Sequence, residues 1–218
     1  MKIKVFEFNP IAVNTYVLYD KTRECVIVDA ACFYPNEQRA LLSFIKDKNL
    51  VIKHLINTHL HFDHVFGVNF IKRQFDIEMQ AHKADEFLLE TMNEQLAMFG
   101  FTPNGDYVPT VGKYIDESDI IKFGNQKLSI MHIPGHSPGS IVFYNKEENV
   151  VVSGDVLFQG SIGRTDLPQG NHEQLIEGIK TKLLTLPSET VVYPGHGPAT
   201  TVKRETKSNP FLHISSSL

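Results

Sequence analysis

The segment Thr-His-Leu-His-Phe-Asp-His, residues 58–64, places three histidines and one aspartate within seven positions. At the frequencies of these residues in the chain, such a run arises by chance in about one sequence in a thousand. A predicted strand, residues 51–59, delivers the run at its C-terminal end. Burying these groups without partners would cost several kcal/mol each. A metal site therefore explains the run better than a polar core without metal.

Three further polar residues follow predicted strands and are flanked by Gly or Pro. They are His136 in I-P-G-H-S, Asp155 in V-S-G-D and His196 in Y-P-G-H-G. Glycine allows the backbone to approach a ligand closely, and a strand end is a rigid position from which a loop side chain can be aimed. We therefore add these three residues to the candidate ligands.

The candidate ligands are now five histidines and two aspartates, which is enough for two metal ions. On an extended turn, His59 and His61 point the same way, so both can bind one ion. The spacing predicts two sets of ligands that share Asp155: His59, His61 and His136 for the first ion, and Asp63, His64 and His196 for the second. Imidazole and carboxylate ligands without thiolate suit zinc, iron or manganese.

Asp29 ends the strand C-V-I-V-D, which is a buried position for a charge. We predict that its carboxylate hydrogen-bonds the second ring N–H of a metal-bound histidine; the alternative is that it caps a turn. The other histidines are predicted to have ordinary surface or core roles: His54, His82, His132, His172 and His213.

Two segments 125 positions apart, residues 15–30 and 140–155, resemble each other. Each has an alternating strand, a polar turn and a β-branched strand, which predicts a β-hairpin. The likeness predicts a duplicated αβ unit with two sheets that face each other. The alternative is that hairpins simply look alike.

Helical apolar spacing predicts helices over 36–50, 65–75, 84–100 and 172–186. A hairpin is predicted around Gly124 and Asn125, and the stretch from Pro103 to Gly112 is predicted to be loop. Strands and helices alternate without a low-complexity linker. The sequence therefore predicts one α/β domain, residues 1–218, with four layers in which helices lie outside two sheets.

Composition excludes several classes of function. The net charge is −4 and no basic face stands out, which argues against a nucleic-acid partner. No apolar run approaches the ~18 residues of a membrane span, and the start M-K-I-K-V-F-E-F-N-P lacks the apolar region of a signal peptide. Cys25 and Cys32 form no C-x-x-C motif. We expect a cytoplasmic monomer or homodimer without disulfides, nucleic acid or membrane.

The motifs T-H-x-H-x-D-H, P-G-H, G-D after a strand and a final P-G-H-G, in this order, resemble the metallo-β-lactamase superfamily. Residues 157–170 and 194–212 are similar to small glyoxalase II-like hydrolases. The resemblance implies an αββα sandwich and a dinuclear metal centre with the two ligand sets above, bridged by Asp155 and supported by Asp29. It implies zinc first, with iron or manganese as alternatives. Glyoxalase II continues into a C-terminal helical domain that grips glutathione, and we expect this protein to be a smaller relative without that domain.

The resemblance implies hydrolysis by a hydroxide that bridges the metal ions. We predict a small-molecule thioester substrate of the S-acylglutathione type, because a thiolate leaves easily. We predict that Asp63 passes a proton to the leaving group; the alternative donor is the metal-bound water. Arg164 is predicted to bind a substrate carboxylate through its planar guanidinium. The alternative is an internal Arg164–Asp166 ion pair that braces the loop.

Four other functions are alternatives. Persulfide dioxygenases share the fold and bind one iron through residues equivalent to His59, His136 and Asp155; sequence separates them poorly from the hydrolases. The missing signal peptide and the absence of a Cys ligand argue against a β-lactamase, and the acidic balance argues against a nuclease. All seven ligand positions are filled, which argues against a non-catalytic binding module.

Overall fold

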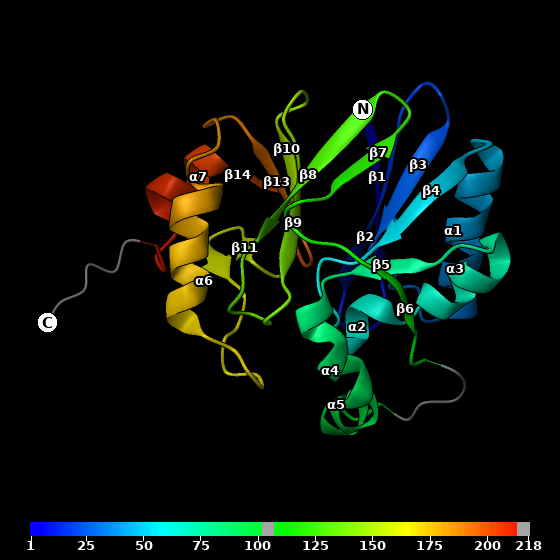
Figure 1. The fold of residues 1–218 in the computed structure, drawn as a ribbon, viewed down its shortest axis with the longest axis horizontal. Helices are drawn as coiled ribbons and strands as arrows, with labels where there is room; N and C mark the ends of the chain where they lie inside the picture. The colour runs from blue at the N-terminus through cyan, green and yellow to red at the C-terminus, as the bar shows by residue number, and fades with distance from the viewer. Residues whose placement is uncertain (102–106, 213–218) are drawn as a thin grey trace, which may run out of the picture.

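Two six-stranded sheets face each other in the computed structural model, which describes residues 1–101 and 107–212 (Figure 1). The first sheet has the order β1-β2-β3-β4-β5-β6. Its strands are β1 (Lys2–Phe8), β2 (Val13–Tyr19), β3 (Glu24–Val28), β4 (Val51–Ile56), β5 (Met79–Ala81) and β6 (Val111–Tyr114). The second sheet has the order β14-β13-β10-β9-β8-β7. Its strands are β7 (Ile120–Phe123), β8 (Gln126–His132), β9 (Ile141–Asn145), β10 (Val150–Gly154), β13 (Val191–Pro194) and β14 (Thr200–Thr201).

Helices cover the outer face of each sheet (Figure 1). The first sheet carries α1 (Pro35–Asp47) and α3 (Val68–Phe75), with α4 (Glu86–Glu90) and α5 (Met92–Met98) at one end. The second sheet carries α6 (His172–Gly178), its π-helical continuation over Ile179–Leu183, and α7 (Val202–Ser208). A short hairpin, β11 (Leu157–Phe158) and β12 (Ser161–Ile162), lies beside them. The predicted four-layer αββα sandwich is confirmed.

Alternation along the strands explains the layers. In β2, Val17 packs against the helices outside the first sheet, whereas Tyr16 and Leu18 pack between the two sheets. Side chains of a strand alternate between its two faces. Both faces of β2 are buried, so most of its residues are apolar. The core accordingly has three apolar clusters, one for each interface between neighbouring layers.

The two similar segments form equivalent hairpins, β2–β3 and β9–β10. Each hairpin is preceded by an antiparallel neighbour (β1 or β8) and followed by a helix and a parallel strand (α1 and β4, or α6 and β13). Asp29 and Gly154 are equivalent in the repeat, and their φ angles are +51° and +50°. The registers differ by one residue, because Tyr19 faces Cys25 while Tyr144 faces Val151. The predicted pair of facing sheets is confirmed, and their origin by duplication stays a hypothesis.

Two predicted helices are broken in the structure. The helix predicted over 65–75 is α2 (Phe62–Val65) followed by α3, and α2 begins inside the histidine run. The chain breaks at Gly67, whose N–H bonds the Ala30 carbonyl at 2.8 Å and whose Cβ, if present, would lie 2.4 Å from Cys32 Sγ. The helix predicted over 84–100 is a 3-10 turn over Lys83–Asp85 followed by α4 and α5, which break at Thr91.

Smaller differences concern strand ends and the predicted loop. The strand predicted over 51–59 ends at Ile56, so the histidine run lies beyond the sheet. Gly112 belongs to the edge strand β6 rather than to a loop, and Pro103 lies outside the described residues.

Cys25 and Cys32 are buried free thiols. Within the described part of the chain, no helix is long and apolar enough to cross a membrane.

Tyr16 joins the two sheets near the start of the histidine-bearing loop at 196. Its buried hydroxyl donates to the Pro194 carbonyl at 2.5 Å, and burial raises its pKa, so the donor proton is retained. We expect Tyr16→Phe to lower the free energy of unfolding by about 1 kcal/mol, since one buried hydrogen bond is lost. Urea denaturation followed by circular dichroism measures the change.

The control for Tyr16→Phe is Tyr193→Phe. Its ring packs edge-on against Tyr16 at 5.7 Å, but its hydroxyl has no partner among the described residues. This variant should unfold at nearly the wild-type urea concentration. An equal loss in both variants would show that the Tyr16 hydrogen bond does not join the sheets as we describe.

Candidate metal centre

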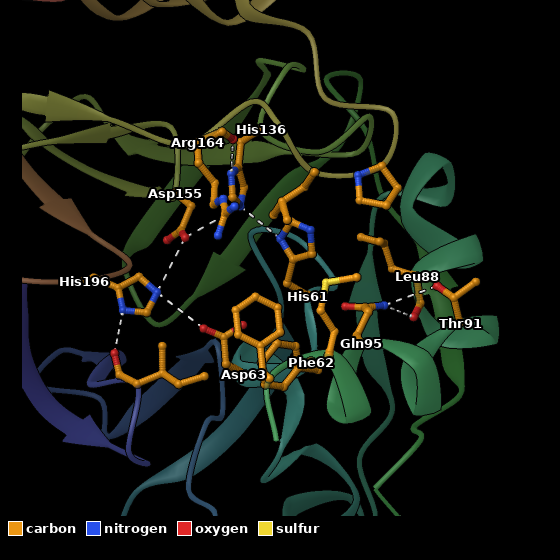
Figure 2. A pocket seen from close by; sticks show the side chains of 15 residues that line it. His61, Phe62, Asp63, Leu88, Thr91, Gln95, His136, Asp155, Arg164 and His196 are labelled. Atoms are coloured by element: carbon orange, nitrogen blue, oxygen red, sulfur yellow. Dashed lines mark hydrogen bonds and ion pairs between the residues drawn. The ribbon is translucent and has the colours of Figure 1, made fainter. Parts of the chain in front are cut away.

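All seven predicted ligands meet at one end of the space between the two sheets. Figure 2 shows His61, Asp63, His136, Asp155 and His196 around the pocket at this end. They come from segments that follow the carboxyl ends of strands: β4 precedes His59, and β8, β10 and β13 precede His136, Asp155 and His196. Asp63 and His64 lie on the single turn of α2. The fold thus brings together residues up to 137 positions apart in the sequence.

The first group contains His59, His61 and His136, whose ligand atoms lie within 4.8 Å of one another. His136 Nε2 lies 2.9 Å from His61 Nδ1 and 3.3 Å from His59 Nε2. Burial lowers the pKa of His61 to about 3, with a further contribution from His136, and it lowers the pKa of His59 well below its usual value. His59 and His61 are therefore neutral, and all three imidazoles direct ring nitrogens toward one point.

The outward nitrogens of four of the five histidines contact oxygen atoms. The pairs are His59 Nδ1 with Thr58 Oγ1 (3.1 Å), His64 Nδ1 with Asp29 Oδ2 (3.0 Å), His136 Nδ1 with the Arg164 carbonyl (2.8 Å) and His196 Nδ1 with the Ile11 carbonyl (3.1 Å). An acceptor on the outward side fixes the proton there and leaves the inward Nε2 lone pair free. This is the arrangement that orients metal-binding histidines in proteins.

The second group contains Asp63, His64 and His196. His196 Nε2 lies 3.4 Å from Asp63 Oδ2 and 3.3 Å from His64 Nε2. Burial alone would lower the pKa of His196, but hydrogen bonds to Asp155 and Asp63 raise it to about 10. The carboxylates of this group therefore require a cation beside them, either a histidinium or a metal ion.

Asp155 lies between the two groups. Its Oδ2 is 3.6 Å from His136 Nε2 and 3.5 Å from His196 Nε2, and its Oδ1 is 3.4 Å from His64 Nε2. Burial would raise the pKa of Asp155, but His64 and His196 hold it well below its ordinary value. Oδ1 is buried and accepts no hydrogen bond among the described residues.

An ionised oxygen that is buried without a donor is costly, and a metal ion on each side of Asp155 would satisfy it. Together with the converging imidazole nitrogens, this oxygen shows that the residues fit two divalent ions of the zinc, iron or manganese type. Gly195 leaves room for the carboxylate, because a Cβ at this position would lie 2.1 Å from Asp155 Oδ1.

Asp29 lies behind the second group, where the sequence places it. Its Oδ2 contacts His64 Nδ1, and its carboxylate also accepts the backbone N–H and the hydroxyl of Thr58, both at 2.7 Å. Both predicted contacts, to a candidate ligand histidine and to the turn, are therefore present. Their role in metal binding stays a prediction.

Arg164 shows the contact that the alternative interpretation predicts. Its guanidinium pairs with both carboxylate oxygens of Asp166 at 2.7 Å, and this hydrogen bond lowers the pKa of Asp166 to about 2. The side chain nevertheless lines the pocket beside the metal centre (Figure 2). Binding of a substrate carboxylate by Arg164 stays a prediction, and its backbone carbonyl has the additional contact to His136 described above.

Four of the remaining histidines lie elsewhere. His82 and His132 stack on each other with ring centroids 4.3 Å apart, His54 contacts the Lys122 carbonyl, and His172 begins α6. His213 lies outside the described residues.

Asp85 is a buried residue of the site that the sequence did not reveal. Its carboxylate accepts the Leu60 N–H at 3.2 Å, the Ser137 hydroxyl at 2.7 Å and the Gly139 N–H at 2.5 Å. Leu60 lies between two candidate ligands, and Ser137 directly follows another, so Asp85 joins the loops that carry the first group. In the sequence it is one acidic residue at a predicted helix start, which is the usual place for a cap.

Several known proteins are similar to this chain. Residues 8–196 match the metallo-beta-lactamase superfamily. Hydroxyacylglutathione hydrolase GloC of Haemophilus influenzae is 37% identical over 217 residues, covering 99% of this chain and 100% of that protein. The crystal structure of BLEG-1 B3 metallo-beta-lactamase is 37% identical, with a TM-score of 0.88 and coverage of 97% and 100%. The crystal structure of TTHA1623 in a di-iron-bound form is 34% identical, with a TM-score of 0.84 and coverage of 96% and 100%.

The contacts of Asp85 predict that it stabilises the first group. Asp85→Ala leaves two buried N–H groups and one hydroxyl without acceptors, each at a cost of about 1–3 kcal/mol. We expect a lower melting temperature and zinc affinity at least about tenfold weaker, as for other outer residues of metal sites. Zinc titration by calorimetry, with circular dichroism as a test of folding, measures both.

Ser137→Ala is the matched control, since it removes only one of the three donors to Asp85. It should weaken zinc binding less than Asp85→Ala does. Wild-type zinc affinity in a folded Asp85→Ala protein would contradict the positioning role.

Proposed function

The chain belongs to the metallo-beta-lactamase superfamily and is a metal-dependent hydrolase, and we propose that its substrates are thioesters of the S-acylglutathione type. The observation that carries the metal chemistry is the buried Asp155 carboxylate between two groups of histidines. The thioester assignment is supported by the similarity to a hydroxyacylglutathione hydrolase, which is 37% identical over 99% of this chain and 100% of that protein.

In the proposed site, each group of residues holds one ion. His59, His61 and His136 would hold the first, Asp63, His64 and His196 would hold the second, and Asp155 would supply its carboxylate to either group. Zinc is the proposed metal, while the di-iron form of a similar structure keeps iron as an alternative. When bound, the ions supply a nucleophilic hydroxide at neutral pH and polarise the scissile carbonyl.

The residues of the chain have separate tasks in this proposal. Thr58 and Asp29 fix the rings of His59 and His64 from behind, and the Arg164 carbonyl fixes His136. Asp63, which also lines the pocket, carries a proton on its carboxylate from the attacking water to the departing group. Apolar side chains such as Phe62 and Leu167 line the same pocket and limit the access of water.

Leaving-group chemistry favours a thioester over an amide. A free thiol has a pKa of about 8.5, so a thiolate leaves at neutral pH with little help from a proton donor. An amine leaves only after protonation and needs a well-placed general acid. Asp63 and Asp155 both line the pocket and are both proposed metal ligands. Asp63 can therefore relay a proton only as a weak general acid. A site with these proton donors is better suited to a thioester, whose thiolate leaves easily, than to an amide.

Turnover of S-lactoylglutathione by zinc-loaded protein tests the proposed function. We expect cleavage that a chelator lowers at least about 100-fold and that added zinc restores, because the ions provide the nucleophile. Asp155→Asn, which removes the shared negative charge, should lose activity and metal together. The matched control is Asp116→Asn, an exposed carboxylate outside the pocket, which should retain both.

Oxygen uptake with glutathione persulfide is followed alongside the thioester assay. One iron per chain and oxygen consumption without thioester cleavage would make the protein a dioxygenase.

The similarity to BLEG-1 also favours a β-lactam as a second candidate substrate. A cephalosporin turned over faster than every thioester would overturn the thioester assignment and keep the hydrolase.

Arg164 and Asp166 allow the substrate role of the arginine to be separated from bracing of the loop. If the guanidinium binds a substrate carboxylate, Arg164→Ala should raise KM for S-lactoylglutathione several-fold, while Asp166→Ala frees the guanidinium and should lower KM. If the pair only braces the loop, both variants lose the same contact. Equal changes in KM for the two variants would therefore exclude the recognition role.

A further inference from the structure

One wall of the pocket is formed by residues that recur every third or fourth position along α4 and α5. This helical wall comprises Leu88, Thr91, Gln95, Met98 and Phe99. In Figure 2, the labelled residues Leu88, Thr91 and Gln95 lie on the side of His61 that is away from Asp155. Thr91 and Gln95 are the polar members of an otherwise apolar surface, so their polar atoms require an explanation.

The orientation of the Gln95 amide is fixed by its neighbours. Nε2 donates to the Leu88 carbonyl at 2.6 Å and to Thr91 Oγ1 at 3.3 Å. Thr91 donates its own hydroxyl proton to the Phe87 carbonyl at 3.0 Å, so its oxygen is free to accept. A flipped amide would place two oxygen atoms 2.6 Å apart, which is repulsive. The amide oxygen must therefore point away from Leu88, and Figure 2 shows it turned toward the His61 side.

The amide oxygen of Gln95 is left without a partner. It is buried, and among residues 1–101 and 107–212 no group donates a hydrogen bond to it. Buried acceptors are almost always satisfied in folded proteins, and the exceptions are unfavourable. An apolar wall that retains such an oxygen, in the pocket that contains the metal ligands, is suited to a molecule that brings its own donor.

We propose that Gln95 Oε1 accepts a hydrogen bond from the substrate, and that this contact selects thioesters that carry a donor close to the scissile bond. The inference rests on the proposed thioesterase function and narrows its substrate class. The donor is either the hydroxyl of a 2-hydroxyacyl group or an amide N–H of the thiol carrier. Met98 and Phe99, with 72% and 43% of their surfaces exposed, belong to the same wall, and in this proposal they contact the apolar part of the substrate.

Three substrates separate the two sources of the donor. S-Lactoylglutathione and S-propionylglutathione differ only in the 2-hydroxyl group, and S-lactoyl-3-mercaptopropionate keeps this hydroxyl on a carrier without an amide N–H. The test variant is Gln95→Met, which has similar volume and no acceptor. The control is Asn93→Met, which makes the same kind of change at an exposed position of α5 outside the pocket.

If the hydroxyl is the donor, wild-type protein should prefer the lactoyl over the propionyl ester by about tenfold in kcat/KM, and Gln95→Met should lose this preference. If the carrier is the donor, Gln95→Met should instead lose the preference for glutathione over mercaptopropionate. Asn93→Met should keep both wild-type ratios. A purely structural role of Gln95 would lower all three rates together and leave the ratios unchanged.

Unchanged ratios in a folded, active Gln95→Met protein would overturn this inference while the thioesterase function stands. Wild-type protein that cleaves none of the three thioesters would instead overturn the proposed function, and the inference with it.

Discussion

The carboxylate of Asp155 is the group on which the site depends. It lies within 3.6 Å of ring nitrogens from both groups of histidines, and one of its oxygens is buried and accepts no hydrogen bond from the residues that the structure describes. A protein interior tolerates such a charge only beside cations. The surrounding histidines and their outward hydrogen bonds direct ring nitrogens toward this one side chain, and the glycine at 195 leaves room for it.

The fold meets this requirement by placing strand ends from two sheets at the same edge. The first sheet provides His59 and His61 beyond β4, and the second provides His136, Asp155 and His196 beyond its own strands. Because each group takes ligands from both sheets, the sheets must be held in a fixed relation. Contacts that cross between the sheets do this, such as Tyr16 with the Pro194 carbonyl and Asp85 with the Ser137 loop.

Much of the fold and the members of the site could be predicted from the sequence, because both depend on local patterns. β-Branched runs predicted the strands, and His or Asp after a strand, next to Gly or Pro, predicted the candidate ligands. The start of α2 inside the histidine run could not be predicted, since four residues are too few to show helical periodicity. The break at Gly67 depends on contacts with residues 30–32, which lie far away in the sequence.

Roles that arise only from tertiary contacts could not be predicted from the sequence either. Asp85 accepts hydrogen bonds from groups 25, 52 and 54 positions away. Gln95 is distinguished only by a buried oxygen to which none of the described residues donates. Arg164 is a similar case. The sequence allowed both an ion pair with Asp166 and a position in the pocket, and the structure shows both.

The most direct test of a two-ion site built around Asp155 is anomalous diffraction at the zinc edge from crystals of the zinc-loaded protein. The account predicts two peaks about 3.5–4 Å apart, one beside His59, His61 and His136 and the other beside Asp63, His64 and His196, with Asp155 between them. A single peak beside the first group, at full zinc loading, would contradict it.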